Sequence, residues 1–144
     1  MRPFFLALAT SALLLLPVTA TFAQEGRHVA PVMANGWPTY PAQYGGFYSG
    51  ALSTADSQAQ DGSRLQFWSF QGQAGGCVLV RMDATEFQPY LQLVRGTPTG
   101  QRVAQGSASL RVEQLPANDS YYIKATSSGS GERLGQYTLS LDPC

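Results

Sequence analysis

The sequence has little of what most enzymes use for catalysis. Among its 144 residues it has one histidine, two cysteines and only 12% charged residues. Nucleophilic catalysis of the Ser-His-Asp or Cys-His kind requires a histidine held beside the nucleophile, whereas His28 lies in a proline-rich stretch near the N-terminus. A glycosidase-like carboxylate pair must face across a cleft, and Asp83 and Glu86 fit a solvated turn better. We therefore predict no catalytic residues and no enzymatic activity.

Clusters of basic residues are also missing. After the first 23 residues, the cations are spread singly over Arg27, Arg64, Arg81, Arg95, Arg102, Arg111, Lys124 and Arg133. Binding to nucleic acid, or to a membrane surface through a polybasic segment, depends on clustered Lys and Arg, so neither is expected. The glycine pairs match no phosphate-binding or dinucleotide-binding pattern, and the Cys and His counts do not suit zinc. No cofactor or metal is predicted.

Long apolar runs are absent except at the start of the chain. Arg2 is followed by an apolar run over Phe4–Leu16, and a small-residue exit follows at Thr21-Phe22-Ala23. Spanning a bilayer takes about 20 apolar residues, and Pro17 ends this run earlier. Residues 1–23 are therefore predicted to be a signal peptide cleaved after Ala23; the alternative is an uncleaved anchor. The mature chain, with eight cations, nine acids and a net charge of −1, is expected to be periplasmic or secreted and free of the membrane.

The two cysteines are Cys77 and Cys144. Export into an oxidising compartment favours a disulfide between them; the alternative is two free thiols. Such a bridge would attach the last strand to the sheet.

The mature chain divides into two parts by pattern. Residues 24–46 mix proline, glycine and aromatics without a period and are read as an extended lead-in. Residues 47–144 show short apolar runs between turn-rich segments, which predicts an all-β domain: an antiparallel, jelly-roll-like β-sandwich of about eight strands. The predicted strands are Phe47–Ser53, Leu65–Gln71, Cys77–Met82, Tyr90–Arg95, Arg102–Gln105, Leu110–Gln114, Tyr121–Thr126 and Tyr137–Leu141. One helical turn is expected near Asp83–Phe87.

Alternation along the strands predicts which side chains face the core. The inward sets are Tyr137, Leu139 and Leu141; Val78, Val80 and Met82; and Trp68 with Phe70. The segment around Trp68 is the most ambiguous, because both of its faces carry aromatic residues.

Taken in order, several short motifs resemble those of the bacterial pre-peptidase C-terminal domain, a β-sandwich module. The matching residues are Gly50, Leu52 and Asp56; Trp68, Phe70, Ala74 and Gly75; Phe87, Pro89, Tyr90 and Leu91; Leu115, Pro116 and Tyr122; and Gly135, Tyr137 and Leu139. They cover residues 47–141. Each motif is weak alone, and their common order makes the resemblance moderately specific.

The departures from this family concern its acidic residues. The acid of the family's Phe-Asp-Pro corner is Gln88 here, and Arg64 and Gln66 stand where an Asp pair is common. Relatives that bind calcium use clustered carboxylates, because this cation needs six to eight oxygen ligands. We therefore expect Gln88 to close the corner by accepting a backbone N–H, with Phe87 anchored beneath it, and to bind no metal.

The resemblance implies an accessory role, because in relatives the module accompanies a secreted hydrolase and assists its secretion, folding or substrate attachment. The first hypothesis is a non-catalytic, exported binding or accessory module that acts on an extracytoplasmic protein or on a polysaccharide or peptide polymer. The alternative is a chaperone or inhibitor acting in trans on a separately encoded secreted protease. A candidate binding surface combines Trp37, Tyr40, Tyr44, Arg64, Phe67 and Arg111, although the lead-in aromatics could instead pack on the domain.

Overall fold

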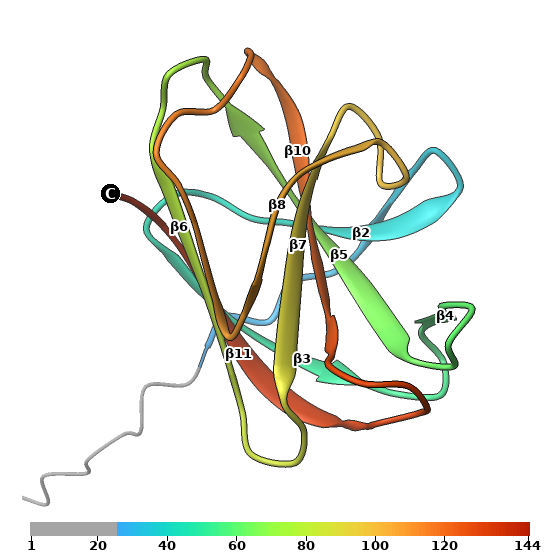
Figure 1. Ribbon diagram of the computed structural model, residues 1–144. Helices are drawn as coiled ribbons and strands as arrows, with labels where there is room; N and C mark the ends of the chain where they lie inside the picture. Colours follow the sequence, from blue (N-terminus) through green and yellow to red (C-terminus); the bar gives the residue numbers. More distant parts are fainter. Residues whose placement is uncertain (1–25) are drawn as a thin grey trace, which may run out of the picture.

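The computed structural model describes residues 26–144, so the predicted signal peptide and its cleavage site at Ala23 lie outside the described residues. The described chain forms eleven β-strands and no helix, and the strands make two sheets (Figure 1). The predicted all-β sandwich is confirmed. Residues 26–144 contain no helix that is long and apolar enough to span a bilayer.

The larger sheet has seven strands and the smaller has four. The larger runs in the order β1 (Val32–Ala34), β2 (Trp37–Pro41), β5 (Arg64–Gly72), β10 (Asp119–Ser127), β7 (Pro89–Arg95) and β8 (Gln101–Ser107), with β4 (Ser57–Gln58) also paired to β5. The smaller runs β3 (Gly46–Leu52), β11 (Gly135–Pro143), β6 (Val78–Ala84) and β9 (Ser109–Val112). Strands pair antiparallel, apart from the parallel pair β2–β5.

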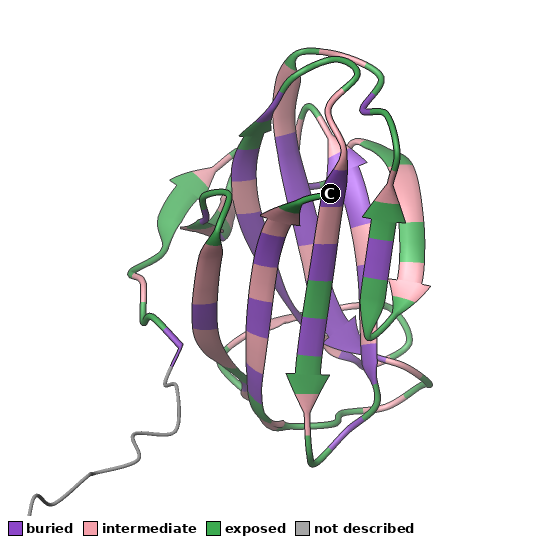
Figure 2. Cartoon of the chain, turned by 90° about the vertical axis from the view of Figure 1, so that its left-hand side faces the viewer, coloured by how far each residue is buried: buried purple, intermediate pink, exposed green. Residues whose placement is uncertain are grey.

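The core lies between the sheets, and the predicted inward sets are confirmed. Along β11, β6 and β5 the inward residues are buried, including Leu139, Val80 and Trp68. Figure 2 looks onto the smaller sheet and shows the alternation of buried and more exposed positions along its strands. Burying such apolar side chains is the main stabilising contribution to a fold of this kind.

All eight predicted strands are present, with ends shifted by a few residues. Strands β1, β2 and β4 were not predicted, and the first two belong to the segment read as a lead-in. Proline at positions 38 and 41 hid β2, because proline lacks the N–H of a regular ladder and is confined to edges or irregular pairings. The helical turn expected near Asp83–Phe87 is wrong: β6 continues to Ala84, and residues 85–87 form a bend.

The β1–β2 hairpin explains why β5 carries aromatic residues on both faces. Its turn is Asn35-Gly36, with φ values of 50° and 81°, as the two-residue type I′ turn requires. The hairpin places Trp37 edge-on against Phe67, with ring centroids 5.4 Å apart. Phe67 is thereby buried outside the main core, in a second cluster with Leu65, Val94 and Tyr122.

The corner before β7 is held by main chain and apolar contacts. Phe87 is buried, as expected, and Gln88 is exposed. The main-chain carbonyl of Gln88 accepts the N–H of Ser128 at 2.8 Å. Among the hydrogen bonds of residues 26–144 there is none from the Gln88 side chain, so the expected side-chain contact is replaced by a main-chain one.

Cys77 and Cys144 form a disulfide, with Cα atoms 5.3 Å apart and a sequence separation of 67 residues. The bridge joins the chain just before β6 to the residue that follows β11, and these two strands are already paired. It therefore fixes the end of β11, one of the two inner strands of the smaller sheet.

Replacing both cysteines, Cys77→Ser with Cys144→Ser, is expected to lower the free energy of unfolding by roughly 4 kcal/mol, because the 67-residue loop of the unfolded chain is released. Urea unfolding of the oxidised protein and of the double variant measures this difference. The same measurement on wild-type protein in reductant is the matched control. A midpoint that is unchanged in both cases would contradict the prediction.

Candidate functional site

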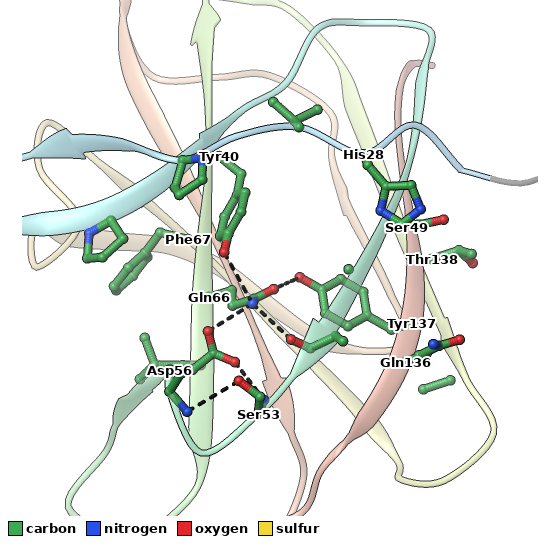
Figure 3. A pocket seen from close by; sticks show the side chains of 18 of the residues that line it. His28, Tyr40, Ser49, Ser53, Asp56, Gln66, Phe67, Gln136, Tyr137 and Thr138 are labelled. Atoms are coloured by element: carbon green, nitrogen blue, oxygen red, sulfur yellow. Dashed lines mark hydrogen bonds between the residues drawn. The ribbon is translucent and has the colours of Figure 1, made fainter.

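An open groove of about 1180 Å³ lies where the chain after residue 26, the end of β2 and strands β3, β5 and β11 come together (Figure 3). The residues that line it are His28, Val29, Pro31, Pro38, Tyr40, Ser49, Gly50, Ala51, Ser53, Ala55, Asp56, Ser57, Leu65, Gln66, Phe67, Asp83, Ala84, Thr85, Gln136, Tyr137 and Thr138. We call this the β3 groove. It has an inner end around Gln66 and an outer end on the smaller sheet.

The inner end is organised by the side chain of Gln66, which is only 8% exposed. Its Nε2 donates to Oδ1 of Asp56 at 2.9 Å and to the carbonyl of Ala51 at 2.9 Å. Its Oε1 accepts the hydroxyl of Tyr137. Both polar ends of the buried amide are thus satisfied, as burial requires.

Tyr137 continues this network into the core. Its hydroxyl oxygen also accepts the Nε1–H of Trp68 at 2.8 Å, so the bond joins β11 of the smaller sheet to β5 of the larger. Tyr137 lies opposite Gly50 on β3, and a Cβ at position 50 would stand 2.5 Å from its ring. The glycine therefore leaves the space the ring occupies. Burial raises the pKa of the Tyr137 hydroxyl, so it stays protonated and able to donate.

Asp56 fastens the loop between β3 and β4 to this network. Its Oδ2 accepts the N–H of Ser53 at 2.7 Å, and its main-chain carbonyl accepts a bond from Arg64 at 2.8 Å. Arg64 also pairs with Glu132 at 2.8 Å. Both carboxylate oxygens of Asp56 therefore accept hydrogen bonds from the protein. Arg64 and Gln66, which stand where the family commonly has an Asp pair, act here as hydrogen-bond donors.

Tyr40 forms the upper wall of the inner end (Figure 3). Its ring packs on Trp68 with centroids 5.0 Å apart, and its hydroxyl lies 3.5 Å from Nε2 of Gln66. Burial, and then the negative charge of Asp56, raise the pKa of this hydroxyl. At neutral pH it remains a neutral donor facing the groove.

The outer end is a row of small polar side chains across the smaller sheet. Thr138 on β11 pairs with Ser49 on one side and with Asp83 on the other. Each follows a buried residue of its own strand: Thr138 follows Tyr137, Ser49 follows Tyr48 and Asp83 follows Met82. The three side chains therefore face outward. Figure 3 shows His28 beside Ser49 at this end.

A second hollow, of about 230 Å³, lies on the larger sheet around Asp61 and Lys124. Oδ1 of Asp61 accepts the hydroxyl of Ser63 at 2.6 Å and its N–H at 3.0 Å. These bonds, more than the nearby Lys124, lower the pKa of Asp61. The hollow is small and its acid is engaged locally, so the β3 groove is the better candidate site.

The structure separates the six residues of the sequence-predicted surface. Tyr40 and Phe67 line the β3 groove, and Trp37 covers the outer side of Phe67. Tyr44 is 40% exposed and stands edge-on to Phe70. Arg64 binds the Asp56 loop. Arg111 lies on β9, at the far edge of the smaller sheet, where it pairs with Glu113 at 2.9 Å.

Sequence reasoning did not identify Gln66, Asp56 or Tyr137 as parts of a site. The available signal was Gln66 at an inward position of a strand whose next inward residues are Trp68 and Phe70, since a polar side chain buried there requires partners. His28 is exposed at the groove, and within the described range no three His, Cys, Asp or Glu residues are grouped to hold a metal ion. The groove therefore offers hydrogen bonds and shape.

Removing one hydroxyl from the network, Tyr137→Phe, is expected to lower the free energy of unfolding by about 1–3 kcal/mol, because Trp68 Nε1–H and Gln66 Oε1 both lose a buried partner. Tyr40→Phe is the matched control. It removes a longer bond from a half-buried residue and should cost less than about 1 kcal/mol. Urea unfolding of the two variants measures both values, and equal losses would refute a special role for Tyr137.

Comparison with solved structures finds eleven matching chains, and three proteins among them illustrate the shared fold. Two are periplasmic inhibitors of g-type lysozyme called PliG. The one from Aeromonas hydrophila has a TM-score of 0.55 at 16% identity, over 74% of this chain and 96% of its own. The one from Salmonella Typhimurium has a TM-score of 0.50 at 14% identity, over 74% and 98%.

The third is the pre-peptidase C-terminal domain of a collagenase from Bacillus anthracis, with a TM-score of 0.52 at 12% identity, over 74% of this chain and 96% of that domain. No protein-family model and no curated protein sequence matches the chain. At these identities the likeness is one of fold. The protein has the β-sandwich fold of pre-peptidase C-terminal domains, as its sequence motifs indicated, and shares it with PliG.

Proposed function

We propose that the protein is an exported, non-catalytic module that binds an extracytoplasmic protein. The observation that carries this proposal is the extent of the match to PliG: the shared fold covers 96% and 98% of the two inhibitor chains. The shared fold thus accounts for nearly all of each inhibitor chain in its solved structure. The predicted signal peptide agrees with a role outside the cytoplasm.

The form of the β3 groove supports binding rather than turnover. At its inner end the polar groups of Gln66 and Asp56 are occupied by protein partners, which makes that end a rigid floor. At its outer end Asp83 is exposed, and the half-buried Ser49 and Thr138 lie beside it on the outward face of the sheet. Groups held in fixed positions bind with less entropy loss than groups that must be ordered.

Within this proposal, the finer function we favour is inhibition of a separately encoded secreted hydrolase, because two of the structures sharing the fold are inhibitors of one. A protease remains the alternative target, since the third structure comes from a collagenase. The alternative role for a binding module is to bind a polymer, and the assay below distinguishes polymer binding from protein binding.

We expect residues 24–144, with the disulfide formed, to bind a g-type lysozyme with a dissociation constant of about 1 μM or lower, equivalent to about −8 kcal/mol. Biolayer interferometry measures the binding, and the clearing of a peptidoglycan suspension measures the loss of lysozyme activity. Peptidoglycan without enzyme is the control, because retention there indicates polymer binding. Absence of binding to both a g-type lysozyme and a secreted collagenase at 100-fold higher concentration would overturn the inhibitor function.

A further inference from the structure

The β3 groove is lined by two carboxylates and by no Lys or Arg. Asp56 and Asp83 are the acidic residues of the lining, which also includes His28. Both oxygens of Asp56 accept protein donors. Asp83 is exposed, and the ion pairs and side-chain hydrogen bonds of residues 26–144 do not include it. The groove therefore presents one carboxylate that is not already used.

The neighbours of Asp83 add acceptors beside this carboxylate. Thr138 is its direct partner across the β6–β11 pair, and Ser49 is the partner of Thr138 on the other side. Side chains directly opposite on one face of an antiparallel pair have Cβ atoms about 4.5–5.5 Å apart. One carboxylate and two hydroxyl oxygens thus stand in a row at the outer end of the groove.

We propose that this row receives a lysine or arginine side chain of the protein partner. An ammonium or guanidinium group has several N–H donors and no acceptor, and it bonds most strongly to an ionised acceptor. Asp83 supplies the charge, and the hydroxyls of Thr138 and Ser49 supply the remaining acceptors. A divalent metal fits less well, because calcium requires six to eight oxygen ligands, several of them charged.

Arg81 is a cationic residue that lies just outside the proposed site. It lies two residues before Asp83 on the same outward face and pairs with Ser140 rather than Thr138, and it does not line the groove. A cationic side chain of the partner would be attracted by Asp83 and repelled by Arg81. Removing these two charges should therefore have opposite effects on binding, which makes Arg81→Gln the matched control for Asp83→Asn.

The inference rests on the proposed function, because it names the part of a protein partner that enters the groove, yet it can be tested without that partner. We expect N-acetyl-arginine amide, titrated into ¹⁵N-labelled protein, to shift the amide signals of Asp83, Thr138 and Ser49. Asp83→Asn should weaken this binding about two- to fivefold, the upper part of the range of an exposed ion pair, and Arg81→Gln should leave it equal or tighter. The neutral analogue N-acetyl-citrulline amide should bind more weakly than the arginine probe.

Equal binding of the arginine and citrulline probes, signal changes confined to other faces, or an Asp83→Asn variant that binds as wild type would each overturn the inference. The spectrum of each variant also shows whether it has folded, so a loss of binding is not confused with unfolding.

A separate measurement with g-type lysozyme distinguishes failure of this inference from failure of the proposed function. If lysozyme binds and Asp83→Asn leaves its association rate and salt dependence unchanged, the proposed function stands and the cation site is refuted. If the arginine probe binds at Asp83 while lysozyme does not bind, the cation site is supported and the lysozyme target is refuted. A rim charge that contacts the partner acts mainly on these two quantities.

Discussion

An amide buried between two sheets destabilises a protein unless both of its polar ends find partners. In this protein the amide of Gln66 meets that requirement by drawing together parts of the chain that are far apart in sequence. It holds the hydroxyl of Tyr137 from the smaller sheet and the carboxylate of Asp56 from the loop after β3. The same tyrosine holds Trp68 in the core. The two sheets, the loop and the floor of the β3 groove therefore share one set of hydrogen bonds, and the shape of the groove depends on it.

The sequence was most informative about the fold where a strand has one wet face. The period-2 patterns around Val80 and Leu139 identified both strands and their core faces, because burial on one side makes the pattern visible. It was least informative for β1 and β2. Asn35-Gly36 is a local signal of their hairpin. The position of the hairpin depends on the parallel pairing of β2 with β5 and on the contact of Trp37 with Phe67, and neither leaves a local pattern. The aromatic residues on both faces of β5 reflect the β1–β2 hairpin that covers its outer face. Alternation along a single strand could not explain them.

The candidate site was harder to predict than the fold, because it is built from side chains that meet only through the topology. Tyr40 and Phe67 were identified because aromatic side chains are candidates for a binding surface by residue type alone. Arg111 was grouped with them by residue type alone and lies on another edge. Gln66 and Asp83 have ordinary surroundings in sequence. Their roles depend on which side of each sheet they face and on which strands become neighbours.

The place of β11 in the smaller sheet has a consequence for how the chain must assemble. β3 and β6 do not pair with each other; each pairs with β11, which comes last. A chain that is made from its N-terminus can pair β5, β7 and β10 before β11 is present to join β3 and β6. Pairings this distant in sequence carry a large loop-closure cost and form slowly. Until residues 135–143 are in place, β3 and β6 each lack the neighbour that β11 provides, and the two halves of the smaller sheet are not joined.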